Sequence, residues 1–124
     1  MVDKFYKNIN ISDKEKFFDV IIDDGSHKLS DTLNSINFFF KNLKPGGLYV
    51  IEDFKFPDYH NHLDDCNEKK IDTILQFIKN KEKFDSNIIN NNMTQYLIDN
   101  VREIFIYKGL LKISDIAFIE KLNQ

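Results

Sequence analysis

The sequence of 124 residues has little of what marks several common classes of protein. Its single cysteine, Cys66, excludes an intrachain disulfide and a cysteine-rich zinc site. It has one arginine against sixteen lysines and a net charge of −3, which argues against a nucleic-acid partner because bidentate capture of phosphates favours arginine. No apolar run reaches the roughly 18 residues that a membrane span needs. The first residues lack the apolar region of a signal peptide, so we expect a cytoplasmic protein.

The remaining composition is that of one globular domain. The hydrophobic content of 42% and the charged content of 30% are ordinary for a soluble fold. Residues 17–22 and 48–51 are nearly continuous apolar runs rich in β-branched residues, typical of strands buried on both faces of a parallel sheet. Between them, apolar residues recur every three or four positions over 29–43, which predicts a helix. Ser30 is its candidate N-cap, and residues 45–47 (PGG) are its candidate stop.

The second half of the chain has weaker patterns. We predict a helix over residues 68–84 and a further helical turn over 94–100. Residues 54–67 and 85–92 are predicted loops, and the lead-in segment 1–16 is predicted to be a loop or a short helix. Residues 101–107 and 116–120 are candidate strands of a terminal hairpin. The predicted fold class is therefore α/β, with a parallel sheet that ends in an antiparallel hairpin.

Acidic residues follow both buried strands. The first strand ends on Asp23 and Asp24, and the second ends on Glu52 and Asp53, 28 residues after Asp24. Ligands of open parallel sheets bind at the carboxyl ends of strands, and neighbouring strands lie about 5 Å apart. Clustered carboxylates repel one another, and a hard divalent cation such as Mg²⁺, Ca²⁺ or Mn²⁺ removes that conflict. The alternative is that one carboxylate caps a helix, one pairs with a lysine and one is solvated.

Three histidines lie close to these acidic residues in the sequence. His27, three residues after Asp24, is a candidate general base, with a capping or solvated role as the alternative. Gly25 permits a tight turn or the close approach of a ligand. His60 and His62 could hold a transition metal only with a third ligand that the sequence does not place, so a solvated loop is favoured.

Residues 18–27 (FDVIIDDGSH) and 43–53 (LKPGGLYVIED) resemble the fourth and fifth strands of class I methyltransferases. More narrowly, they resemble the sugar O-methyltransferases related to macrocin O-methyltransferase and the cephalosporin-hydroxylase-like family. Residues 101–120 resemble the closing sixth and seventh strands. The resemblance covers residues 17–121 and implies a partial Rossmann-like sheet with strand order 4-5-7-6. The family's first half, with its Gly-rich cofactor turn, has no counterpart among these residues.

The resemblance also implies roles for individual residues. Asp24, Glu52 and Asp53 would be Mg²⁺ ligands, His27 the general base, and Asp23 and Gly25 would lie on the side of S-adenosylmethionine. The acceptor would be a sugar hydroxyl, and a partner chain or self-association could supply the missing strands. Two other hypotheses stay open at this point: a non-catalytic binding module, and a metal-dependent enzyme resembling glycosyltransferases.

Overall fold

The computed structural model describes residues 17–123, which form a four-stranded sheet with helices on one side. Its order is β1-β2-β4-β3, where β1 pairs parallel to β2 and β4 pairs antiparallel to both β2 and β3. The strands are β1 (Phe18–Asp23), β2 (Leu43–Ile51), β3 (Val101–Tyr107) and β4 (Ile116–Lys121). This arrangement confirms the predicted sheet order 4-5-7-6. The lead-in segment 1–16 lies outside the described residues.

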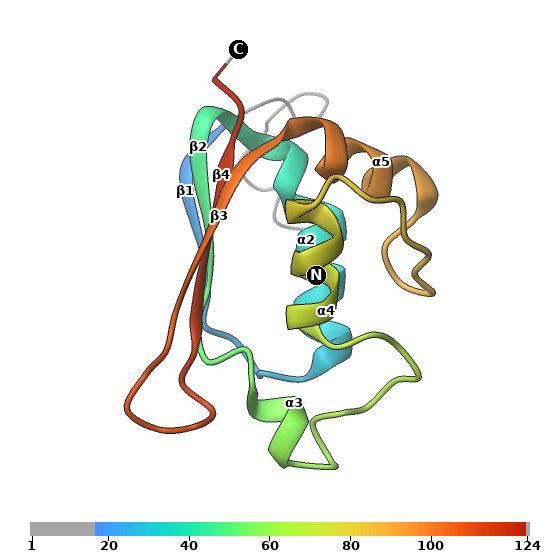
Figure 1. Cartoon of the computed structure of the whole chain (residues 1–124), viewed down its shortest axis with the longest axis vertical. Helices are drawn as coiled ribbons and strands as arrows, with labels where there is room; N and C mark the ends of the chain where they lie inside the picture. Colours follow the sequence, from blue (N-terminus) through green and yellow to red (C-terminus); the bar gives the residue numbers. More distant parts are fainter. Residues whose placement is uncertain (1–16, 124) are drawn as a thin grey trace, which may run out of the picture.

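Three helices cover the same face of the sheet, as Figure 1 shows. They are α2 (Leu29–Phe39), which continues into the short 3-10 helix η2 (Phe40–Asn42), α4 (Ile71–Lys79) and α5 (Asn91–Asn100). A fourth, α3 (Phe56–Tyr59), has four residues and follows β2. None of the described helices is both long enough and apolar enough to cross a membrane.

Several predicted boundaries were wrong. Ser30 lies inside α2 and is not its N-cap; Lys28 holds that position without a side-chain cap. Residues 45–47 belong to β2 and do not stop the helix, because the chain has already left the helical conformation at Leu43. The helix predicted over 68–84 ends at Lys79, just before Lys81 adopts a left-handed φ of 58°.

The core lies between the helices and one face of the sheet. Tyr49 and Ile51 of β2 pair with Ile119 and Ala117 of β4, and all four are buried beneath the helices. At the far end of β4, the buried Lys121 donates hydrogen bonds to the carbonyls of Leu43 (2.8 Å) and Lys41 (3.2 Å). These hydrogen bonds help to satisfy the buried ammonium group and fix the start of β2 to the end of β4.

The opposite face of the sheet has no helix over it among the described residues. Val20 and Ile22 of β1 are 51% and 60% exposed, and Phe105 and Tyr107 of β3 share that face at 45% and 58%. The prediction that the first strand is buried on both faces was therefore wrong. The apolar run correctly predicted a strand, but within residues 17–123 β1 is an edge strand whose helix-covered face alone is packed.

Candidate metal centre

The parallel pairing of β1 and β2 brings the two acidic strand ends to the same edge of the sheet. Asp23 is opposite Ile51 in the register, and the amide of Glu52 donates a hydrogen bond of 3.0 Å to the carbonyl of Asp23. The pairing therefore extends one residue beyond β2. The loops that carry Asp24 and Asp53 leave the sheet from this point.

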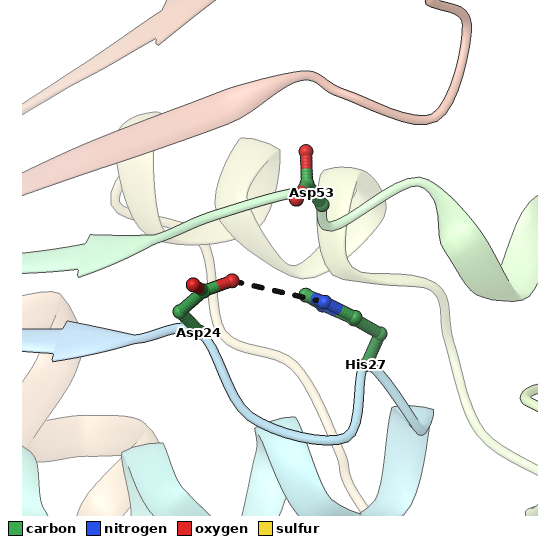
Figure 2. A group of neighbouring side chains, drawn as sticks. All are labelled: Asp24, His27 and Asp53. Carbon is green, nitrogen blue, oxygen red and sulfur yellow. Dashed lines mark ion pairs between the residues drawn. The ribbon is translucent and has the colours of Figure 1, made fainter.

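Asp24, His27 and Asp53 form one cluster at this edge, shown in Figure 2. One potential ligand atom from each residue lies within 4.8 Å of the others. The imidazole Nε2 of His27 is 3.7 Å from Oδ1 of Asp24. Carboxylate oxygens are the ligands that hard divalent cations prefer, so the two aspartates of this cluster suit Mg²⁺.

The backbone of this cluster is held in an unusual conformation. His27 has a φ of 64° and Asp53 a φ of 51°, and only one other non-glycine residue in the described part of the chain has a positive φ. The left-handed region costs an ordinary L-residue about 1–2 kcal/mol, so such residues persist where the surrounding structure holds them. Positive φ at two of the three clustered residues is consistent with a site built for binding.

Local hydrogen bonds hold the loop that carries His27. The hydroxyl of Ser26 donates to Asp31 of α2 at 2.5 Å and accepts from the amide of Lys28 at 3.2 Å. The amide of Gly25 donates to Oδ1 of Asp23 at 3.1 Å. Gly25 therefore forms a side-chain-capped turn, and its φ is not positive.

An aromatic residue that the sequence patterns did not single out completes the surroundings of His27. The ring of Phe56, in α3, stacks on the imidazole with centroids 4.6 Å apart and an interplanar angle of 16°. Residues 54–67 were predicted to be a loop, and α3 within them was missed because four residues are too few to show a helical period. The only sequence signal for the contact with His27 was the presence of Phe56 three residues after Asp53.

The other predicted site residues lie around this cluster. Glu52 is half-buried at the end of β2 and is not one of the three clustered residues. His60 and His62 are exposed, with ring centroids 5.9 Å apart, and neither belongs to a group of three potential ligands in residues 17–123. The solvated-loop interpretation of this histidine pair therefore stays the preferred one.

Asp23 lines a hollow of about 360 Å³ that adjoins the cluster, since Asp24 also lines it. Its Oδ2 atom is buried without a hydrogen-bond partner in the described part of the chain, and burial raises the pKa of its carboxyl. The phenol oxygen of Tyr49, which lines the same hollow, is also buried and unpartnered. Burial and, secondarily, the negative charge of Asp23 raise the pKa of Tyr49 above its usual range.

Comparisons with known proteins point to one kind of enzyme, although no family model matches the chain. It is 28% identical over 109 residues to mycinamicin VI 2''-O-methyltransferase of Micromonospora griseorubida, which covers 84% of this chain and 26% of that protein. Over 63 residues it is 40% identical to 8-demethyl-8-alpha-L-rhamnosyl tetracenomycin-C 2'-O-methyltransferase of Streptomyces olivaceus, covering 48% of this chain and 17% of that protein.

A solved structure agrees with these sequence relatives. The MycE methyltransferase from the mycinamycin biosynthetic pathway, in complex with Mg, SAH and mycinamycin VI, superposes with a TM-score of 0.62 at 25% identity. The match covers 86% of this chain and 26% of that chain. In both fold and sequence the chain is similar to part of a class I methyltransferase domain. More particularly, the chain is similar to the C-terminal part of the sugar and macrolide O-methyltransferases, and it spans about a quarter of the length of the mycinamicin enzyme.

Proposed function

We propose that this chain is the metal-binding and base-carrying part of a magnesium-dependent O-methyltransferase that acts on a sugar hydroxyl with S-adenosylmethionine. The observation that carries the proposal is the convergence of Asp24, His27 and Asp53 at the carboxyl edge of the parallel strands. Edges of this kind are where open α/β sheets bind their ligands. The solved relative contains Mg and SAH, which agrees with the proposal.

The roles in this proposal follow from chemistry and position. Asp24 and Asp53 would hold Mg²⁺. Glu52, which lies outside the cluster, is the third carboxylate ligand that the family resemblance implies. A bound Mg²⁺ would acidify an acceptor hydroxyl, and S-adenosylmethionine would supply the methyl group. His27 would accept the hydroxyl proton at Nε2, the nitrogen that faces Asp24. Asp23 and Gly25 would lie towards the cofactor.

The imidazole of His27 is well placed to accept a proton. Phe56 covers one face of the His27 ring, and the side chain of His27 is 22% exposed, so its orientation is restricted while its edge remains open to the cluster. Restricting the orientation of a base before the substrate arrives lowers the entropic cost of the proton transfer. A partner chain or self-association would supply the strands that complete the cofactor pocket.

Metal binding tests the proposal directly. Titration with Mn²⁺, followed by NMR line broadening, should broaden the signals of Asp24, His27 and Asp53 first, and excess Mg²⁺ should reverse the effect. Asp24→Asn and Asp53→Asn should each weaken binding at least about tenfold. Asp19→Asn is the matched control, since this exposed residue of β1 pairs with Lys44 at the strand's other end and should bind metal normally. Unchanged binding by both site variants would refute the assignment.

A non-catalytic binding module is the second candidate function. It predicts that Asp24→Asn and His27→Ala leave the binding of a partner unchanged. It also predicts that the protein transfers no methyl group, whether or not it binds metal. A methyl-transfer assay of the complete assembly therefore separates the two candidates. Loss of methyl transfer in both variants would support the methyltransferase proposal.

A further inference from the structure

The short helix α3 carries Phe56, the residue that stacks on His27, but it does not belong to the helical layer over the sheet. Figure 1 shows it beyond the end of α4, where the chain has left β2. A backbone hydrogen bond of 3.0 Å from the amide of His60 to the carbonyl of Phe56 closes its turn. A helix this short does not hold its shape alone, because the first turn costs more backbone freedom than one hydrogen bond returns. Contacts with other elements must therefore set where the Phe56 ring lies.

Lys55, the residue immediately before α3, makes such a contact. Its Nζ donates a hydrogen bond of 2.6 Å to Oδ2 of Asp72, in the first turn of α4. The same ammonium lies 3.6 Å from Oδ2 of Asp58 within α3, and 5.9 Å over the ring of the buried Phe54. Lys55 therefore joins α3 to the start of α4 across 17 residues of sequence.

The geometry of this ion pair distinguishes it from the many surface pairs that contribute little. Those are screened by solvent, and both of their side chains are free to move. Here the side chain of Lys55 is 22% exposed, and Oδ1 of Asp72 accepts a second hydrogen bond, of 2.8 Å, from the amide of Thr73. A short charge-assisted hydrogen bond between two restrained groups fixes the distance between the elements that carry them.

The placement of Phe56 depends on this link, because Phe56 is the next residue along the chain. One face of its ring meets the imidazole of His27, with centroids 4.6 Å apart. The ring of His60, 5.6 Å away and tilted by 31°, belongs to an exposed residue and restrains Phe56 less. A shift of α3 away from α4 would therefore carry the Phe56 ring off the imidazole.

We propose that Lys55 is a positioning residue for His27: its ion pair with Asp72 holds α3 against α4 and so keeps the Phe56 ring stacked on the imidazole. The inference rests on the proposed function, since a restrained imidazole matters there as the base. The position of the ring can nevertheless be measured without metal, cofactor or acceptor. Failure of the metal titration would leave that measurement standing, and the reverse is also true.

NMR of the metal-free full chain reports the stack, because an aromatic ring over the imidazole displaces the signals of its carbon-bound protons upfield. In Lys55→Met, the His27 signals should lose at least about half of that displacement. Asp72→Asn removes the other partner and should have the same effect, and the double variant should go no further, because paired residues are not additive. Lys55→Arg keeps a donor for Asp72 and should retain the wild-type signals.

Lys70→Met is the matched control. Lys70 precedes α4 and pairs with Asp64 at 2.8 Å, so this variant removes a comparably close ion pair from the same part of the chain and leaves the link from Lys55 to Asp72 in place. Its His27 signals should be those of the wild type. Circular dichroism checks that each variant is folded, and a lysine that served stability alone would leave the His27 signals of a folded variant unmoved.

Three results would overturn the proposal. They are unchanged His27 signals in Lys55→Met and Asp72→Asn, an equal change in Lys70→Met, and wild-type His27 signals that show no upfield displacement. If Lys55→Met does not fold, Asp72→Asn and Lys55→Arg decide in its place, since the first should move the His27 signals and the second should not.

Discussion

At the scale of single residues, the buried hydroxyl of Tyr49 is the clearest departure from a fully satisfied core. Tyr49→Phe should raise the free energy of unfolding at pH 7 by about 1 kcal/mol, because it removes a buried polar atom that has no partner. Urea denaturation at pH 7 measures this change. A destabilised variant would mean that the hydroxyl is paired in solution.

The same substitution predicts a dependence on pH. The phenol of the unfolded chain ionises near pH 10, whereas burial raises the pKa of native Tyr49 above that. Above about pH 10 the unfolded state therefore binds fewer protons than the native state, and the stability of the wild type falls as pH rises. Phenylalanine has no ionisable hydroxyl. The difference in free energy of unfolding between Tyr49→Phe and the wild type should therefore grow between pH 9 and pH 11 in the same denaturation experiment.

Phe56 is the residue that restrains His27. Phe56→Leu removes a stacked ring, and aromatic stacking contributes about 0.5–1.5 kcal/mol, so the imidazole should become more accessible. Modification of His27 by diethyl pyrocarbonate, followed by mass spectrometry, should accelerate about two- to tenfold. Tyr59→Leu, at an exposed position of the same helix, is the control and should leave the rate unchanged. An unaltered rate in Phe56→Leu would show that the stack does not restrain the ring.

Residue patterns predicted the candidate site better than its surroundings. Asp24 and Asp53 were expected to meet because parallel neighbouring strands end together, and the structure brings them together with His27. Glu52, one residue from Asp53, was expected in the same place but lies outside that cluster. Side chains of adjacent residues diverge, and spacing along the sequence does not say which of two points inward.

At the scale of elements, the N-terminus of α5 depends on one side chain. Oδ1 of Asn90 accepts a hydrogen bond of 2.8 Å from the amide of Met93, and the amide of Asn90 donates one of 3.0 Å to Asn37 in α2. Asn90→Ala should lower the free energy of unfolding by about 1 kcal/mol through loss of the cap. Urea denaturation measures it, with the exposed Asn92→Ala as the control from the same Asn-rich tract. Equal effects of the two variants would contradict the capping role.

The elements also show where the sequence was less informative. Residues 94–100 predicted only a helical turn, because the Asn-rich stretch before them has no apolar period, whereas the cap at Asn90 lets α5 begin at Asn91. The apolar run at 17–22 predicted a strand but not its exposure. The sequence shows which side chains of a strand are apolar. Whether they are buried depends on which other segments of the chain pack against them.

At the scale of the whole molecule, the candidate metal cluster and the hollow at Asp23 differ in how fully the described residues enclose them. The candidate metal cluster is assembled from two adjacent loops, whereas the hollow at Asp23 is lined by β1, which pairs with β2 alone among the described residues. We therefore expect the isolated chain to bind Mg²⁺ but to show no saturable micromolar binding of S-adenosylhomocysteine, with or without Mg²⁺, by calorimetry. Saturable micromolar binding would contradict this expectation and would show that association completes the pocket.

The hydrogen bond from the amide of Glu52 to the carbonyl of Asp23 has a consequence for the choice of ion. It keeps the two loops one interstrand distance apart, about 4.8 Å, at the place where the carboxylates of Asp24 and Asp53 begin. The separation of the two backbone segments that carry these carboxylates is thus set by main-chain pairing. Discrimination between ions of different radius, such as Mg²⁺ and Ca²⁺, should therefore persist in variants that weaken the binding of both.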